Sequence, residues 1–252
     1  MNQHINKQLL LWCIAIIAVV SVGLIPPIAQ DLNYHYFADT RSLWGIPNGC
    51  NVLSNIPFFL VGLYGLHFVL HHKTQLQSLY WGAFTFVIGV SLVSLGSGYY
   101  HWSPNNDTLV WDRLPMTIAF MGLYAMVVSA FVHAESGVRL LPWLLLAGFA
   151  SVIYWIVTET AGQGDLRWYA LVQFLPMILT LVTLMIFQSK GINKSNLIAA
   201  LVCYTFAKLF EFGDSFIFEF TGIVSGHCLK HLAAAVASYF VINWISAAGA
   251  RN

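Results

Sequence analysis

Long apolar runs alternate with short polar segments along the whole chain. Each run holds about 20 residues, the length that an α-helix needs to cross the hydrocarbon core of a bilayer. The short connections favour antiparallel packing of neighbouring helices. The pattern therefore predicts an all-α polytopic membrane helix bundle, with eight spans at residues 9–29, 51–71, 79–101, 113–132, 139–158, 168–188, 195–213 and 228–248.

The composition agrees with this class. Of the 252 residues, 58% are hydrophobic and 8% are charged, and the mean hydropathy is +0.72. Soluble domains carry about 25% charged residues. No polar stretch is long enough to form a soluble second domain. The net charge of +1 gives no reason to expect a nucleic-acid partner.

The first span has two interpretations. Lys7, an apolar run from Leu9, and the segment Pro26-Pro27-Ile28-Ala29-Gln30 resemble a signal peptide with a cleavage region. However, the apolar stretch is long for a signal peptide, and no clean small-x-small cleavage pattern follows it. We therefore expect residues 1–30 to form a retained N-terminal transmembrane helix. The longest irregular polar segment, residues 30–50, lies between the first two spans.

Basic residues predict the orientation of the bundle, because cytoplasmic loops are enriched in Lys and Arg. With the N-terminus inside, six basic residues fall in inner loops or ends, and three fall in outer ones. The inner set is Lys7, Lys73, Arg139, Lys190, Lys194 and Arg251, and the outer set is Arg41, Arg113 and Arg167.

With this topology, polar residues from three distant spans meet at the outer side. His101 ends the third span, Asp112 starts the fourth, and His227 and His231 open the eighth. His227 and His231 are four residues apart, as are Ser97 and His101, so each pair shares one helix face. Polar groups inside a membrane are costly, and their gathering in one leaflet indicates a function.

These residue types suit a metal centre. Three histidines supply the protein ligands of a catalytic zinc site and leave a fourth position open. Each residue also has a structural interpretation. Asp112, ahead of Leu114-Pro115-Met116, is expected near a helix N-terminus and can be a cap. Ser97, between Gly96 and Gly98, can be a small residue at a close helix contact.

A second histidine group lies at the predicted inner end of the bundle. His67 and His71 are also four residues apart, and His72 follows, with His133 and Glu135 on the same side. A second metal site is one interpretation. The alternative, which we favour, is a polar helix end at the lipid interface, where cationic side chains are common.

The remaining polar residues within the spans give weaker patterns. The four cysteines do not have zinc-ligand spacing, and Cys228 points about 100° away from His227 on a helix. Cys50 and Cys228 can both face outward, so a disulfide between them stays open. Lys208 and Glu211 are charges inside the seventh span, and their spacing allows an ion pair.

The chain resembles the alkaline ceramidase family, part of a wider set of seven-helix membrane proteins that includes adiponectin-receptor-like proteins. The resemblance rests on Ser97-x-x-x-His101, on Asp112 before Leu-Pro-Met, and on His227-x-x-x-His231. Residues 48–58 also resemble the segment that opens the first core helix of the family. The resemblance implies a seven-helix catalytic domain at residues 31–252, with the first span as an N-terminal addition.

The resemblance implies a zinc-dependent hydrolase that cleaves the amide bond of a ceramide-like or related lipid. In that case His101, His227 and His231 bind Zn²⁺, Asp112 is the general acid and base, and Ser97 stabilises the oxyanion. The lipid substrate would enter from the bilayer. In a Gram-negative cell the protein would lie in the inner membrane, with the site facing the periplasm.

The sequence departs from the family at its calcium site. Asp31 matches the first acidic position, but Leu32 stands where the family has tryptophan, and Tyr34 lies near the position of a glutamate. The Ca²⁺ ligands left by the resemblance would be Asp31, Asn33, Asp39 and Asn48. Their low charge argues against calcium, which takes several oxygen ligands.

Two other functions stay open at this stage. One is a non-catalytic receptor or sensor on the same scaffold, with zinc in a structural role. The other is a metal-ion transporter, in which the histidines form a transit site. A transporter should have polar ligands at several depths, whereas the candidate ligands here cluster at one side. A structural zinc requires neither Ser97 nor Asp112, so their presence favours the enzyme.

Overall fold

A computed structural model describes residues 2–188 and 193–249. Eight of its helices are long and apolar enough to cross a membrane, so the predicted all-α bundle is confirmed. The α-helices are α1 (Asn2–Leu24), α2 (Gly49–Leu53), α3 (Ile56–His71), α4 (Lys73–Leu76), α5 (Tyr80–Trp102), α6 (Asn106–Val127), α7 (Ala134–Thr160), α8 (Arg167–Ile186), α9 (Ser195–Phe212), α10 (Asp214–Thr221) and α11 (Gly226–Gly249). Short 3₁₀ turns lie at Leu32–His35 and Gln77–Leu79, and a π-helical turn at Val128–Val132 extends α6.

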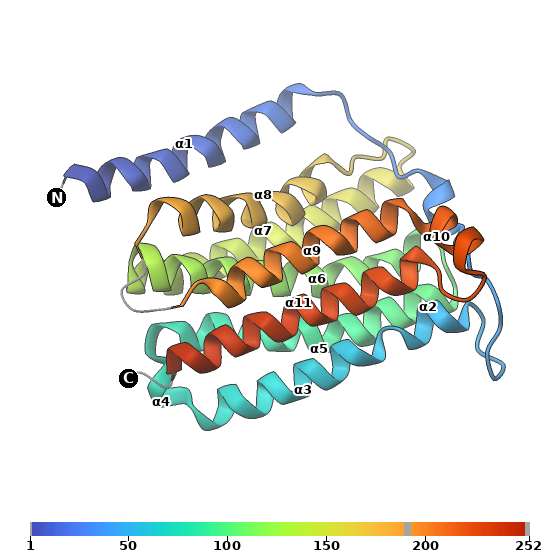
Figure 1. The fold of residues 1–252 in the computed structure, drawn as a ribbon. Coiled ribbons are helices and arrows are strands. Elements are labelled where there is room, and N and C mark those ends of the chain that lie inside the picture. Colours follow the sequence, from blue (N-terminus) through green and yellow to red (C-terminus); the bar gives the residue numbers. More distant parts are fainter. Residues whose placement is uncertain (1, 189–192, 250–252) are drawn as a thin grey trace.

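The long helices run side by side, and α6 lies at the centre of the bundle (Figure 1). In its apolar window 72% of the residues are buried, against 6% for α1, which packs mainly against α8. Helix α11 packs between α3 and α9, whereas α5 packs between α3 and α6. Helix α1 is therefore peripheral to the seven other long helices.

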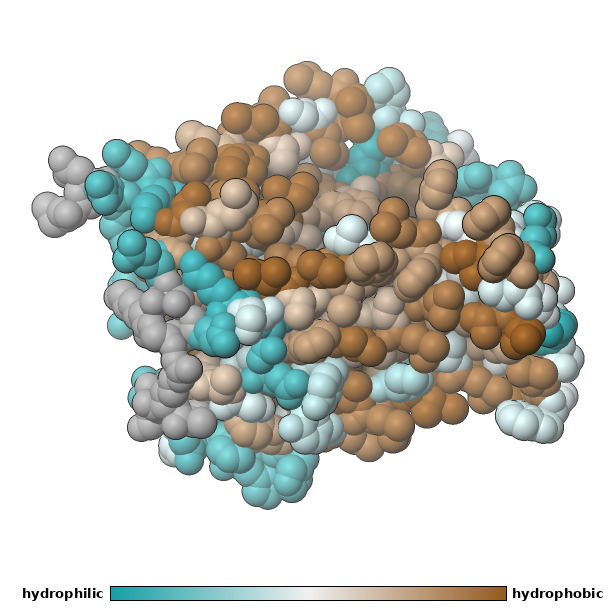
Figure 2. Space-filling model, in the orientation of Figure 1, coloured by the Kyte–Doolittle hydropathy of each residue, from teal (hydrophilic) through white to brown (hydrophobic). Residues whose placement is uncertain are grey.

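The surface is that of a membrane protein. Figure 2 shows hydrophobic residues along the length of the helices and most hydrophilic residues at the two ends. Trp12, Ile17, Leu60, Trp143 and Met185 are among the large apolar side chains that are exposed. Such a surface fits lipid, in which exposed apolar groups carry no penalty.

The basic residues of the predicted inner set lie at one end of the bundle. Lys7, Lys73, Arg139 and Lys194 are at or near the end that holds both chain termini, and Arg41, Arg113 and Arg167 are at or near the other (Figure 1). Lys190 and Arg251 lie outside the described residues.

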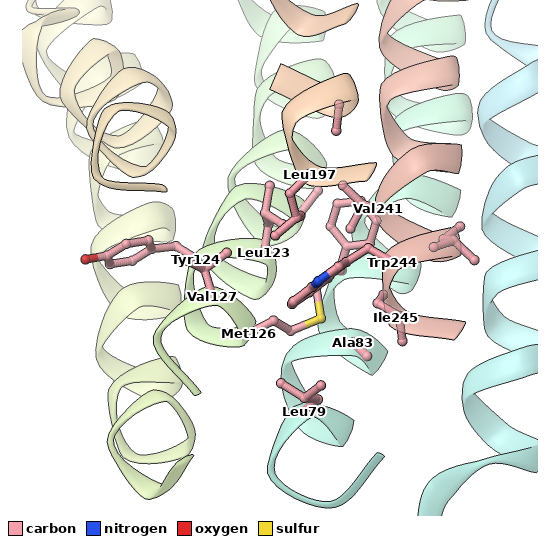
Figure 3. Close-up of a cluster of buried hydrophobic side chains, with 14 of the residues drawn as sticks. Leu79, Ala83, Leu123, Tyr124, Met126, Val127, Leu197, Val241, Trp244 and Ile245 are labelled. Carbon is pink, nitrogen blue, oxygen red and sulfur yellow. The ribbon is translucent and has the colours of Figure 1, made fainter. Parts of the chain in front are cut away.

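The main apolar core lies between α5, α6, α9 and α11. Figure 3 shows Met126 and Val127 of α6 in one cluster with Leu79, Ala83, Leu197, Val241, Trp244 and Ile245. Trp244 and Ile245 are fully buried. The association of helices in lipid brings no hydrophobic gain, so it depends on close van der Waals packing of this kind.

Small residues bring α5 and α6 together. A side chain at Gly96 would place its first carbon 1.9 Å from the carbonyl oxygen of Trp111, and one at Gly89 would lie 2.5 Å from the nitrogen of Ala119. Glycine is therefore required for this backbone contact. The same contact sets the separation between Ser97 on α5 and Asp112 on α6.

The predicted start of the fourth span was wrong by about two turns of helix. Helix α6 begins at Asn106, with Asn105 and Thr108 forming a capping box. Asp112 is therefore inside the helix and is not its N-cap, and Pro115 lies in the helix interior instead of the first turn. Capping therefore does not explain why an aspartate is present at position 112.

We expect Gly96→Ala to lower the stability of the protein, because the added carbon would overlap the Trp111 carbonyl. Overpacking of this kind costs about 1–3 kcal/mol. Thermal unfolding of the detergent-solubilised protein measures the effect. Gly98→Ala is the matched control, since an added carbon there meets nothing within 4 Å. Equal unfolding temperatures for the two variants would contradict the close contact.

Candidate metal centre

Three buried histidines converge at one end of the bundle. His101 comes from the last turn of α5, and His227 and His231 come from the first two turns of α11. One nitrogen from each ring lies within 4.8 Å of the others. Nε2 of His101 is 3.2 Å from Nε2 of His231 and 3.3 Å from Nε2 of His227. Among the described residues this is the single group of side chains arranged to hold a metal ion.

The distances between the nitrogens fit one small cation. A tetrahedral ion with bonds of about 2.0–2.1 Å to nitrogen would place its ligand nitrogens about 3.3 Å apart. The two Nε2 separations measured here are 3.2 and 3.3 Å. A neutral imidazole has one donor and one acceptor nitrogen, so three Nε2 atoms around one point cannot all satisfy one another. The donor set therefore fits a metal ion that takes imidazole ligands.

The segment at residues 37–48 holds His101 in place. The side-chain amide of Asn48 donates a hydrogen bond to the carbonyl oxygen of His101, with a nitrogen–oxygen distance of 2.9 Å. Phe37 packs its ring against both His101 and His227, with centroid distances of 4.7 Å in each case. An aromatic ring thus covers two of the three imidazoles.

Helix α11 begins against the end of α9 and the start of α10. A side chain at Gly226 would lie 2.2 Å from the carbonyl oxygen of Phe210, so glycine permits this approach. The carboxylate of Asp214 accepts a hydrogen bond from the backbone N–H of His227 at 2.7 Å. The hydroxyl oxygen of Ser54 lies 2.7 Å from Nδ1 of His231. This contact orients the ring of His231 and leaves its Nε2 for a metal.

Ser97 and Asp112 lie beside the histidines. Both are buried and line a cavity of about 280 Å³ that His231 also lines. The hydroxyl of Ser97 interacts with the carboxylate of Asp112. A carboxylate and a hydroxyl thus face the same space as one of the candidate metal ligands. That arrangement suits proton transfer and the stabilisation of negative charge on a bound molecule.

A network of charged side chains lies next to the site, and the sequence predicted only part of it. The predicted pair is present, with Nζ of Lys208 2.7 Å from the carboxylate of Glu211. The same carboxylate binds Lys230 at 2.8 Å and accepts a hydrogen bond from the Tyr34 hydroxyl at 3.2 Å. Burial and the nearby carboxylate of Glu211 raise the pKa of Tyr34 well above its usual value, so this hydroxyl keeps its proton.

Lys230 reaches one of the candidate metal ligands. Its Nζ lies 3.2 Å from Nε2 of His227, besides its ion pair with Glu211. Its position in the sequence, between His227 and His231 at the start of an apolar span, could have revealed it. Nothing local in the sequence identifies Ser54, because its partner lies 177 residues away.

The four calcium candidates do not share one set of contacts. Asp39 pairs with Arg41 through both carboxylate oxygens, and these hydrogen bonds lower the pKa of Asp39 below its usual value. Asp31 accepts a hydrogen bond from the backbone N–H of Asn33, and Asn48 holds His101 as described above. That their low charge disfavours calcium at these residues stays a prediction.

His71 and His72 of the second histidine group contact the backbone of their own helix. Nδ1 of His71 lies 2.7 Å from the carbonyl oxygen of His67, and Nδ1 of His72 lies 2.9 Å from that of Phe68. These contacts lie within the last turns of α3, as expected for a polar helix end. The four cysteines are free, and Cys228 lies 3.2 Å from the side-chain oxygen of Asn51 instead of facing the imidazoles.

Comparisons with known proteins return no family: no family model matches the chain, and no curated protein matches it. The interpretation of the site therefore depends on its geometry and on the motifs in the sequence.

We expect the purified protein to contain about one metal ion per chain, because one site provides three converging imidazoles. Replacing His227 and His231 together by alanine should remove it. The matched control replaces His67 and His71, which have the same spacing at the other end of the bundle. Elemental analysis measures the metal in each protein. Metal that survives the first double substitution and is lost with the second would place the site elsewhere.

Proposed function

We propose that the protein is a zinc-dependent membrane hydrolase that cleaves the amide bond of a ceramide-like or related lipid. The observation that carries the proposal is the position of His101, His227 and His231 beside Asp112 and Ser97. This combination of metal ligands, carboxylate and hydroxyl suits metal-assisted hydrolysis. A structural zinc in a receptor would need neither of the last two residues.

The cavity supports a lipid substrate. From Asp112 its lining continues along α6 to Leu123, and from His231 along α11 to Val241. Eleven residues of helix span about 16 Å, close to half of the roughly 30 Å hydrocarbon core of a bilayer. Apart from its polar end, the cavity is lined mainly by apolar side chains, such as Phe58, Phe86 and Met177. One acyl chain of the length found in a leaflet matches this space.

The roles of the residues follow from their chemistry. Zinc, when bound by the three imidazoles, lowers the pKa of water to about 7 and polarises a carbonyl group. Asp112 accepts a proton from the attacking water and delivers it to the nitrogen of the leaving amine. Ser97 donates its hydroxyl proton in a hydrogen bond to the carbonyl oxygen as negative charge develops there. The apolar side chains that line the cavity hold the acyl chain and keep bulk water away from the amide.

Basic residues support an orientation with the site on the outer side. Lys7, Lys73, Arg139 and Lys194 are at the end opposite the histidines, as cytoplasmic residues would be. The protein then lies in the plasma membrane, or the inner membrane of a Gram-negative cell, with the site towards the periplasm.

Asp112→Asn should abolish amide hydrolysis while the metal stays bound, because the variant loses proton transfer and keeps all three imidazoles. Ser97→Ala should reduce the rate by about 10²–10³, as expected for the loss of one oxyanion donor. Turnover of a lipid amide that the unmodified protein cleaves, either an N-acyl sphingoid base or an N-acyl amine with an anionic headgroup, tests both, with metal content as the control. Near-normal turnover by the Asp112→Asn protein would contradict the role of Asp112 as general acid and base.

Thiol labelling tests the orientation. Gln163 lies in an exposed loop at the end that holds the site, and Thr74 is exposed at the opposite end. We expect Gln163→Cys to react with a membrane-impermeant reagent on intact spheroplasts, and Thr74→Cys to react only after lysis. The unmodified chain, with its four free cysteines, gives the background. The reverse pattern would place the site on the cytoplasmic side.

A further inference from the structure

Arg113 is a buried cation with an unused hydrogen-bond donor. It lies on α6, next to Asp112, and is 6% exposed. Its guanidinium is held by the rings of Trp155 and Tyr169, at 4.0 and 4.6 Å from their centroids. Nη2 donates a hydrogen bond to the side-chain oxygen of Gln30 at 2.6 Å. Nη1 is buried and has no hydrogen-bond partner.

The other arginines of the described residues each have a carboxylate partner. Arg41 pairs with Asp39, Arg139 with Glu135 and Arg167 with Asp165, at nitrogen–oxygen distances of 2.6 to 2.8 Å. Within residues 2–188 and 193–249, Arg113 has no such ion pair. It is also the most buried of the four. The charge that is most costly to bury is therefore the one without a counter-ion in contact.

A buried guanidinium cannot avoid this cost by losing its proton, because arginine stays charged in proteins. An unpaired buried charge is normally found where a ligand or a metal supplies the partner. The planar fork of arginine matches carboxylate and phosphate groups, which accept two parallel hydrogen bonds. The free donor of Arg113 therefore suits an oxyanion of the ligand.

The position of Arg113 relates this donor to the reaction site. Arg113 lines the same cavity as Asp112, Ser97 and His231. Among the charged residues of that lining, Arg113, Lys208 and Lys230 are cations, and Asp112 and Glu211 are anions. The lining therefore carries one more cation than anion, before any metal ion adds to the positive charge. An anionic ligand would balance it.

The cavity also shows which part of the ligand Arg113 would meet. The apolar part of the lining runs away from Asp112 along α6 towards Leu123. Arg113 is at the other end, where Gln30 of the segment between α1 and α2 contacts it. If the acyl chain occupies the apolar part, the amine portion of the amide lies at the end that holds Arg113.

We propose that Arg113 binds a carboxylate or phosphate group on the amine portion of the lipid amide. The proposal rests on the hydrolase function above and narrows its substrate to amide lipids with an anionic headgroup. Gln30, Trp155 and Tyr169 hold the guanidinium in place, and Nη1 supplies the donor for the anion.

Two matched pairs of lipids test the proposal with the full-length protein in detergent. N-palmitoylglycine and its methyl ester differ in a carboxylate, and N-palmitoyl phosphoethanolamine and N-palmitoylethanolamine differ in a phosphate. Binding is measured by thermal shift in the Asp112→Asn protein, which prevents turnover. We expect the anionic member of at least one pair to bind about 10- to 100-fold tighter than its neutral partner, the usual effect of a charge-assisted hydrogen bond. The pair that shows the preference identifies carboxylate or phosphate.

Adding Arg113→Gln should remove the preference without weakening the neutral lipids, and Arg113→Lys should retain part of it, because the charge remains. Arg139→Gln is the control, since this exposed arginine lies at the opposite end of the bundle. If Arg113→Gln does not fold, the preference of the parent protein and its partial loss in Arg113→Lys still decide the question.

Equal binding within both pairs would overturn the proposal. Arg113-dependent binding of palmitate, with equal binding of the two lipids in each pair, would also overturn it, because the guanidinium would then recognise the fatty-acid product. A hydrolysis assay distinguishes a failure of this proposal from a failure of the hydrolase function. Cleavage that depends on Asp112 but does not depend on headgroup charge would support the hydrolase function and contradict the role of Arg113. An Arg113-dependent preference in binding, without cleavage of any amide, would contradict the hydrolase function instead.

Discussion

The convergence of three imidazole nitrogens is the constraint on which the rest of the structure depends. His101 and His231 belong to α5 and α11, which both pack against α3, and their Nε2 atoms are 3.2 Å apart. Both are held by the segment that precedes α3, since Asn48 binds the carbonyl of His101 and Ser54 contacts His231. The segment therefore fixes the depth and rotation of two helices at once. A metal ion would complete an arrangement in which neutral imidazoles alone leave nitrogens unsatisfied.

Much of the fold follows from apolar run length, and the eight predicted spans are all present. The convergence of the histidines also follows from simple topology, because alternate crossings return distant residues to one side. The start of α6 was missed, although Asn105 and Thr108 form the kind of reciprocal cap that a sequence can reveal. The apolar run beginning after Asp112 concealed it. Contacts such as that of Ser54 with His231 could not be predicted, because no local pattern specifies a partner 177 residues away.

The charges inside the bundle illustrate how a membrane protein accommodates polar chemistry. Glu211 contacts Lys208, Lys230 and Tyr34, so a single carboxylate pairs with two cations and accepts a hydrogen bond from a neutral donor. Each partner comes from a different element, and the network joins α9 and α11 to the segment before α2. Groups this costly to bury are kept where they serve a site. Lys230 meets that expectation, since it also reaches His227.

The irregular segment between α1 and α2 completes the site. It crosses the end of the bundle and contacts several helices in turn, with Gln30 on α6, Tyr34 on α9 and the backbone of Ala38 on Asp214 of α10. Phe37 of the same segment covers two of the imidazoles. A loop of this length exposes backbone groups that lipid cannot satisfy, so it is stable only at the aqueous end of the bundle. Its position there places a polar cover over an apolar cavity. Under the proposed function, the acyl chain of the lipid would occupy this apolar cavity, and the reaction would take place at its polar end, beneath the segment.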